Sequence, residues 1–232
     1  MVVLRNTVKW LGAWVVLLIL SMLAAEGLHL TNPNVDPNAM LVTLSLCFSW
    51  LAVLLMPDLP GPTTRNGVLI LWAVIAAAGF FALTLSLLYD EPVHRGLRLS
   101  GGVLVLVLLF GFIQSLVMAC TSSRANAMIL FTVILGVFFA APLYLGVVAE
   151  AAPGNTPIVN AIVAASPVSY VAAIVDYDYL HSSWFYRNTP FGGLRFDYPT
   201  AGKMTFFYLI ITLLLVGANL LHNRLQTRKR SQ

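Results

Sequence analysis

The sequence predicts an all-α, polytopic membrane protein, a bundle of six transmembrane helices with a broken hairpin near one membrane surface. Of its 232 residues, 59% are hydrophobic and only 9% are charged, whereas about a quarter of the residues of soluble domains are charged. Its mean hydropathy is +0.86. The apolar stretches are about 18 to 22 residues long, which matches helices crossing a hydrocarbon core of ~30 Å. No soluble domain fits between them, so we expect a single transmembrane domain over residues 1–232.

Each span is predicted from an apolar run closed by turn or charged residues. The first run follows Arg5 and Lys9 as in a signal peptide, but more spans come after it, so it is interpreted as an uncleaved span. Asn-Pro and Asp-Pro steps precede the second run, and a proline-rich PDLPGP segment follows it. The six expected spans are residues 8–25, 39–56, 67–88, 100–120, 127–148 and 204–221.

The stretch 156–175, TPIVNAIVAASPVSYVAAIV, is apolar enough to be a span but is interrupted at Ser166 and Pro167. Proline removes a backbone donor and disfavours a helical residue before it. An unpaired backbone group inside hydrocarbon costs several kcal/mol, so such a break must be satisfied by protein or water. We therefore expect two half-helices that form a re-entrant hairpin, the second capped by Ser166.

Charge distribution orients the six-span arrangement. Alternating the loops between the two sides gives one side eight of the 13 basic residues, in short connections: Arg5, Lys9, Arg65, Arg124, Arg224, Arg228, Lys229 and Arg230. The other five lie in longer connections. The positive-inside rule then predicts that both termini are cytoplasmic. The basic tail is interpreted as a topology anchor near anionic lipids and not as a nucleic-acid site.

Few polar groups fall within the predicted spans, and none of these is Asp, Glu, Lys or Arg, which argues against a proton relay or an ion pump. Gln114 and Ser115 lie deep in the fourth span. Their amide and hydroxyl either join neighbouring helices or contact a substrate. Gly111 with Ser115, and Gly136 with Ala140, have the spacing that lets helices approach closely.

No pattern in the chain predicts catalysis, a cofactor or a metal. The four histidines lie at span ends or in loops, and neither they nor Cys47 and Cys120 have a metal-ligand or redox spacing. The chain has no G-x-x-x-x-G-K-[ST] loop, no G-x-S-x-G elbow and no H-E-x-x-H motif. We expect no enzymatic activity from this chain itself.

Residues 176–203 form an aromatic, polar segment on the predicted outer side. Aromatic side chains are enriched at membrane interfaces, and together with flanking charges they also mark contact sites. The segment is therefore either an interfacial belt or a docking surface. The candidate contact residues are Tyr177, Tyr179, Trp184, Phe185 and Tyr186.

Residues 111–230 resemble the membrane subunits of ABC exporters of the polysaccharide, drug and copper-enzyme-maturation type. The resemblance rests on a span ending in QSLVMACTSSRANA, a span with a late proline (LFTVILGVFFAAPLYLG), the SPVSYVAAI hairpin and a last span ending in RLQTRKR. It implies six spans with both termini inside and an outer re-entrant hairpin at 156–175. It also implies an inner turn at 121–126.

Two functions follow from these observations. The first is a permease subunit that forms a dimer in a bacterial cytoplasmic membrane and depends on a separate ATPase chain. The second is a non-catalytic membrane subunit that anchors or scaffolds a larger complex through its helix faces and its aromatic outer segment. Both have the lipid bilayer and other protein subunits as partners.

Overall fold

The computed structural model describes Val15, Ile19 and residues 36–56, 62–87, 93–121, 123–144, 156–181 and 199–230. These residues form helices and connecting turns, without a strand among them, which confirms the all-helical prediction. The helices are α2 (Pro37–Leu54), α3 (Pro62–Leu87), α4 (Val93–Cys120), α5 (Arg124–Phe139), α7 (Thr156–Ala165), α8 (Pro167–Ile174) and α10 (Ala201–Arg230), with 3₁₀ turns η1 (Ala141–Tyr144) and η2 (Tyr179–His181).

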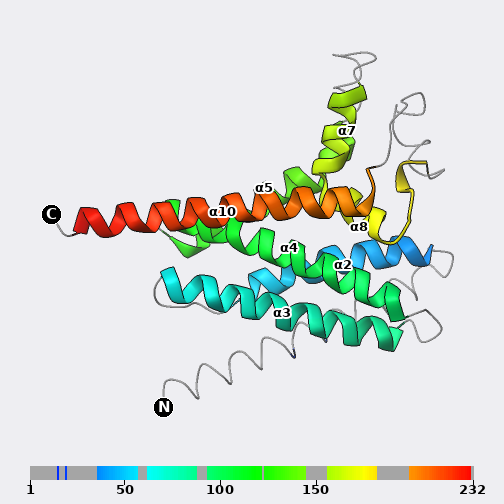
Figure 1. Cartoon of the computed structure of the whole chain (residues 1–232), viewed down its shortest axis with the longest axis horizontal. Helices are drawn as coiled ribbons and strands as arrows, with labels where there is room; N and C mark the ends of the chain where they lie inside the picture. Colours follow the sequence, from blue (N-terminus) through cyan, green and yellow to red (C-terminus); the bar gives the residue numbers. More distant parts are fainter. Residues whose placement is uncertain are drawn as a thin grey trace.

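Helix α4 is the centre of the bundle. It contacts α2, α3, α5, α8 and α10, and the long helices run side by side along the length of the molecule (Figure 1). Glycine permits two of these contacts, because a Cβ at Gly111 would lie 2.5 Å from Leu69 Cδ1 of α3, and one at Gly102 would lie 2.4 Å from Ile174 Cδ1 of α8. Glycines that line helix contacts let backbones approach in this way in membrane bundles.

Two ends of the bundle are distinguished by their polar residues. The first, called here the Asp176 end, gathers the beginnings of α2, α4 and α10 and the last residues of α3 and α8, and it contains Asn38, Arg95, Arg98 and Asp176. The opposite end, called the Gln114 end, gathers the last turns of α2 and α4 and the first turn of α5. Apolar side chains fill the region between the two ends.

Four of the described helices are long and apolar enough to cross a membrane, or up to five if the bent pair α7–α8 counts as one span. α2, α3, α4 and α10 correspond to the expected spans 39–56, 67–88, 100–120 and 204–221. The expected first span, residues 8–25, lies outside the described residues except for Val15 and Ile19, which are helical and half exposed. The number of six spans therefore stays a prediction.

Several helix ends differ from the expected span ends. α4 begins at Val93 and not at Ser100, so part of the charged connector is helical, and α10 continues to Arg230, through the basic tail. Within the expected fifth span, 127–148, α5 ends at Phe139, and residues 145–148 lie outside the described residues. Pro142 explains the early end, since its ring clashes with the carbonyl four residues earlier and it has no N–H to donate. The 3₁₀ turn η1 follows the end of α5.

The expected break at Ser166 and Pro167 is present. α7 and α8 are bent by 83° at this point, and α7 projects sideways from the bundle while α8 lies within it (Figure 1). α8 packs against α2, α4 and α10, whereas α7 contacts α8 and η1. The half-helix that is integrated into the core is therefore the second one, whose buried residues include Tyr170, Val171 and Ala172.

Candidate functional site

The break between α7 and α8 is stabilised from α10 by an aromatic pair. The rings of Tyr170 and Tyr208 stack with centroids 4.6 Å apart and planes 15° apart. The Tyr208 hydroxyl donates a hydrogen bond to the carbonyl oxygen of Ala165, 3.0 Å away. A continuous helix would have paired that carbonyl with the amide four residues on. Tyr208 thus satisfies a backbone group that the break releases inside the bundle.

Tyr170 anchors the same junction through its hydroxyl, which lies 3.2 Å from Thr205 Oγ1. Because Thr205 Oγ1 donates its own proton to the carbonyl of Ala201, 2.8 Å away, Tyr170 is the donor in this pair. α8 is therefore joined to the first turns of α10 by both ring stacking and hydrogen bonding.

α8 ends in a tight left-handed turn at Asp176. The Tyr177 N–H donates to the carbonyl of Ala172 at 2.8 Å, and Asp176 has φ of 56°, the arrangement of a Schellman C-cap. Aspartate is among the few residues other than glycine that adopt this conformation with some frequency. The turn directs the chain away from α8 and presents the Asp176 carboxylate at the end of the bundle.

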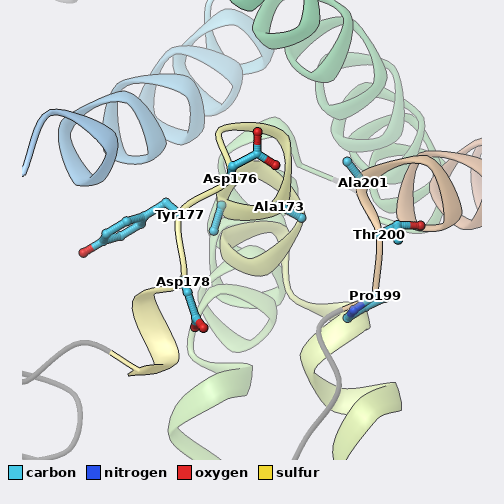
Figure 2. Close-up of a pocket in the computed structure, with 8 residues that line it drawn as sticks. Ala173, Asp176, Tyr177, Asp178, Pro199, Thr200 and Ala201 are labelled. Atoms are coloured by element: carbon cyan, nitrogen blue, oxygen red, sulfur yellow. The ribbon is translucent and has the colours of Figure 1, made fainter.

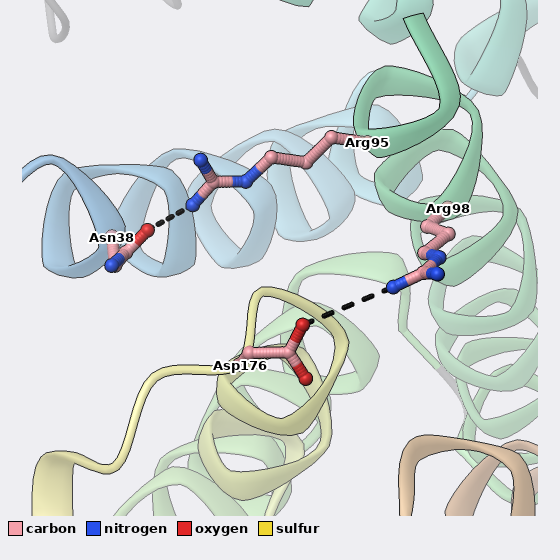
Figure 3. A network of polar contacts seen from close by, with 4 residues as sticks. All are labelled: Asn38, Arg95, Arg98 and Asp176. Carbon is pink, nitrogen blue, oxygen red and sulfur yellow. Dashed lines mark hydrogen bonds and ion pairs between the residues drawn. The ribbon is translucent and has the colours of Figure 1, made fainter. Parts of the chain in front are cut away.

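Arginines of α4 meet polar groups of two other elements at this end (Figure 3). Arg98 Nη1 lies 3.8 Å from Asp176 Oδ2, with side chains that are 62% and 85% exposed, respectively. Arg95 donates to the side-chain oxygen of Asn38 in the first turn of α2. Since both members of the Arg98–Asp176 pair face solvent, the pair adds at most about 1 kcal/mol to stability and can open at little cost.

Two cavities flank the contact between α8 and α10 at the Asp176 end. The first, of about 350 Å³, is lined by Asp176 and Asp178, whose carboxylates point in opposite directions (Figure 2). The second, of about 300 Å³, contains Arg98, Tyr170 and Thr205, and three of its other lining residues are glycines. Asp176 lines both cavities. Together they bring Arg98, Asp176 and Asp178 to the contact between α8 and α10, and we take them as the candidate site.

Tyr177 borders the first cavity as a neutral phenol. Burial raises the pKa of its hydroxyl above the ordinary value, and the negative charge of Asp36 raises it further. Both effects disfavour the phenolate. The negative charge in the first cavity therefore comes from its two aspartates.

A third, smaller cavity lies deeper in the bundle, beside the break. Its volume is about 160 Å³, and its lining from α4, α5 and α10 is apolar, with Phe110, Phe138 and Phe207 among its walls. Ala165 and Pro167 also line it. Tyr208 lines it as well, so the cavity borders both the break and one ring of the tyrosine stack.

Of the residues singled out from the sequence, Gln114 and Ser115 are buried in α4 near the Gln114 end. Gln114 Nε2 lies 3.5 Å from the carbonyl oxygen of Val53 in α2 and 3.1 Å from the sulfur of Met128 in α5. The amide therefore contacts two neighbouring helices. A role in a substrate path stays a prediction, and these residues lie away from the polar cavities.

Ser166 does not cap α8 with its side chain, contrary to expectation. It occupies the N-cap position, and its carbonyl accepts the Tyr170 N–H at 3.0 Å. Its Oγ, however, is buried and makes no hydrogen bond with any described residue. The backbone of Ser166 alone begins the helix, with Pro167 at the first helical position, where its missing N–H is not needed.

The predicted outer contact surface is described only in part. Tyr177 and Tyr179 lie just beyond α8, and the Tyr179 hydroxyl is 2.8 Å from Ser169 Oγ. At least one of these aromatic residues thus holds the turn against α8. Trp184, Phe185 and Tyr186 lie outside the described residues.

The cavity residues Arg98, Tyr170, Asp176 and Tyr208 did not stand out in the sequence. In the sequence Arg98 and Asp176 are charges of predicted connections, and the two tyrosines lie within apolar stretches. No group of three or more His, Cys, Asp or Glu side chains within the described residues could hold a metal ion. No protein-family model, curated protein or solved structure matches this chain.

Proposed function

We propose that this chain is the membrane-embedded permease subunit of an ABC-type transport system and that a separate ATPase subunit supplies the energy. The observation that supports the proposal most directly is the pair α7–α8, bent by 83° and placed between α5 and α10. Discontinuous helices are characteristic of membrane transporters, where irregular backbone is tolerated if it is buried in protein or lines a cavity.

The surroundings of the break suit an element that changes position. α8 is held by side-chain contacts and not by a continuous helix, since Tyr208 supplies the partner of the Ala165 carbonyl. The exposed pair of Arg98 and Asp176 joins α4 to the turn after α8 and can open at little cost. Cavities border α8 at that end and at the break. We infer a dimer in a bacterial cytoplasmic membrane, with the Asp176 end facing outward and both termini in the cytoplasm.

The test is purification of the full chain in mild detergent and identification of the chains that accompany it. A stoichiometric P-loop ATPase, whose hydrolysis rate changes when the chain is reconstituted with it, is the expected result. Accompanying redox or structural subunits without an ATPase would contradict the proposal.

Accompanying redox or structural subunits would instead select a second candidate function, a non-catalytic subunit that scaffolds a larger membrane complex. The observation that favours it is the exposure of α10, of whose apolar window only 22% is buried, against 61% for α4. The exposed residues include Phe206, Leu213 and Leu214. A partner helix or lipid can cover such a face, and the accompanying chains distinguish the two candidates.

A further inference from the structure

The apolar cavity beside the break is a groove with a buried floor and an exposed rim, called here the α5–α10 groove. On its floor, Phe110 of α4 is 1% exposed and Leu135 of α5 is 2% exposed. At its rim, Phe138 of α5 is 42% exposed and Phe207 of α10 is 44% exposed. The groove therefore opens at the side of the bundle, between α5 and α10.

The arrangement of the helices leaves this space open. α5 and α10 both pack against α4 and α8. Within the part of the chain that the structure describes, they make no extensive contact with each other. Ala165 and Pro167, on the two sides of the break, also line the groove. The space between α5 and α10 is therefore bordered by α4 and by the break, and it has room for another apolar group.

The lining of the groove favours an apolar occupant. None of its residues is charged, and the one polar side chain among them, Tyr208, donates its hydroxyl proton to the Ala165 carbonyl. The volume is about 160 Å³. A cavity of about 150 Å³ that is lined by Leu, Ile and Phe stays dry and binds benzene. An apolar occupant gains dispersion contacts that an empty space would lack, whereas water would have too few polar partners there.

The groove lies at the depth of acyl chains. Arg98 and Lys203 are the last charged residues before the apolar runs of α4 and α10, and basic residues at such positions lie at the polar boundary of the bilayer. At ~1.5 Å per residue, the lining residue Ile113 lies about 22 Å along α4 from Arg98. On the same scale, the lining residue Ile211 lies about 12 Å along α10 from Lys203. Both distances fall within a hydrocarbon core of ~30 Å, so acyl chains and not headgroups border the groove.

The rim continues into the apolar outer surface of α5 and α10. Val137, which precedes Phe138, is 54% exposed. Phe206, which precedes Phe207, is 67% exposed. Lipid tails are as apolar as such side chains and cover them in a membrane bundle. An acyl chain on this surface can therefore enter the groove without leaving the hydrocarbon.

We propose that the α5–α10 groove binds one acyl chain of a membrane phospholipid. The chain passes between Phe138 and Phe207 and lies on the buried floor. There it contacts the ring of Tyr208, whose hydroxyl supports the break through the Ala165 carbonyl. Because the lining offers no charged group, the groove does not distinguish one headgroup from another. This inference is independent of the proposed transport function.

The test is photo-crosslinking of the full-length chain in phosphatidylcholine vesicles that contain a trace of phosphatidylcholine with a diazirine within one acyl chain. Peptide mass spectrometry locates the adducts. We expect adducts on Phe110 and Leu135, which lipid at the outer surface does not reach. Leu106 of α4 is 0% exposed and does not line the groove. It should carry about a tenth as many adducts or fewer, because a close-packed side chain leaves no space for a lipid chain.

The same experiment distinguishes the acyl chain from other parts of the lipid. Phosphatidylethanolamine and phosphatidylglycerol with the same photoreactive acyl chain should label the floor as phosphatidylcholine does. Labelling of the floor by only one of the three lipids would overturn the proposal. So would labelling of Phe110 and Leu135 at no more than the level of Leu106 while the exposed Leu214 is labelled.

Two variants fill the groove from different helices. Ile113→Trp acts from α4 and Ile211→Trp acts from α10, at partly buried residues of the lining. Each should reduce the adducts on Phe110 about tenfold, because the indole takes the space of the acyl chain. Leu214→Trp is the matched control, since it adds the same side chain at a residue of α10 that is 69% exposed and does not line the groove. Thermal unfolding verifies that each variant is folded, and unreduced labelling in both folded filling variants would contradict the proposal.

A second copy of this chain is the alternative occupant. In a chain with Cys47→Ala and Cys120→Ala, Phe207→Cys places a thiol at the rim. We expect no disulfide-linked dimer after oxidation in the same vesicles, because lipid covers the rim. Efficient formation of that dimer, together with an unlabelled floor, would show that a second copy covers the groove and would overturn the assignment to a lipid.

Discussion

The hydroxyl of Tyr208 and the carbonyl oxygen of Ala165 are 3.0 Å apart, and this hydrogen bond lies at the point where the α7–α8 pair is broken. Pro167 prevents the chain from continuing as one helix. The bond from α10 replaces one that the helix would have made itself. The break is thus stabilised by a residue 43 positions later in the chain.

Tyr208→Phe should destabilise the protein by about 1–3 kcal/mol, because it leaves a buried carbonyl without this donor. The ring and its stacking on Tyr170 are retained, so the change isolates the hydrogen bond. The free energy of unfolding is measured in mixed micelles of mild detergent and dodecyl sulfate.

Tyr170→Phe is the matched control. It removes the other hydroxyl of the stack, but Thr205 keeps its own bond to the Ala201 carbonyl, so the expected loss is only about 0.5–1.5 kcal/mol. A loss in Tyr208→Phe below about 1 kcal/mol would show that the Ala165 carbonyl does not depend on Tyr208.

The close contact between α3 and α4 provides a second prediction. At Gly111 an added Cβ would lie 2.5 Å from Leu69 Cδ1 and 3.1 Å from Leu69 Cγ, and Leu69 is 1% exposed. Gly111→Ala should therefore cost about 1–3 kcal/mol from overpacking, only partly offset by about 1 kcal/mol of improved helix propensity.

Gly136→Ala in α5 is the comparison for Gly111→Ala. No described atom lies within 4 Å of a Cβ at Gly136, so the substitution should stabilise the protein by about 0.5–1 kcal/mol. Both changes are followed by thermal unfolding. A stabilised Gly111→Ala would mean that the Leu69 side chain or α3 as a whole can give way without cost.

The sequence predicted the helices better than their ends. The length of the apolar runs in the sequence identified α2, α3, α4 and α10, because burial and lipid exposure both require long apolar runs. It did not identify the end of α5, since an apolar run continues beyond the Pro142 region as far as Val148. Nor did it predict that α4 is surrounded by five other helices, which depends on how the glycines of α4 meet side chains of distant elements.

The candidate site was less predictable than the fold. Ser166 and Pro167 signal a break by local chemistry, which a sequence displays directly. The partners of that break, Tyr170 and Tyr208, are 38 positions apart and look like ordinary members of apolar segments. Asp176 looked like a loop charge, and its contact with Arg98 depends on the left-handed turn after α8.

Gln114 provides the third prediction. Gln114→Leu should leave the fold intact and cost less than about 1 kcal/mol, since interhelical hydrogen bonds in membranes average about 0.6 kcal/mol. Its contact with the Val53 carbonyl is long, at 3.5 Å, and that carbonyl also accepts the Met56 N–H at 3.2 Å. Unfolding in mixed micelles measures the change.

Trp72→Phe is the comparison for Gln114→Leu. It removes a 2.7 Å bond to the Ala52 carbonyl together with buried ring volume, so a larger loss, of about 2 kcal/mol or more, is expected. If Gln114→Leu abolishes transport or assembly while the protein stays folded, Gln114 has a functional role beyond joining helices.

The last prediction concerns the side of the membrane on which each end of the bundle lies. From Lys203 to Arg228, α10 extends about 37 Å at ~1.5 Å per residue, which exceeds a hydrocarbon core of ~30 Å. Arg228 is in the basic tail, which the positive-inside rule assigns to the cytoplasm. In a chain with Cys47→Ala and Cys120→Ala, we expect Asn34→Cys and Lys203→Cys to react with an impermeant maleimide on intact cells. Arg124→Cys and Arg228→Cys should react only after permeabilisation. Reaction of Asn34→Cys and Arg228→Cys from the same side would exclude six spans with both termini inside. Reaction of all four cysteines from outside would indicate leaky cells. Labelling of a cytoplasmic marker protein in the same sample detects such leakage.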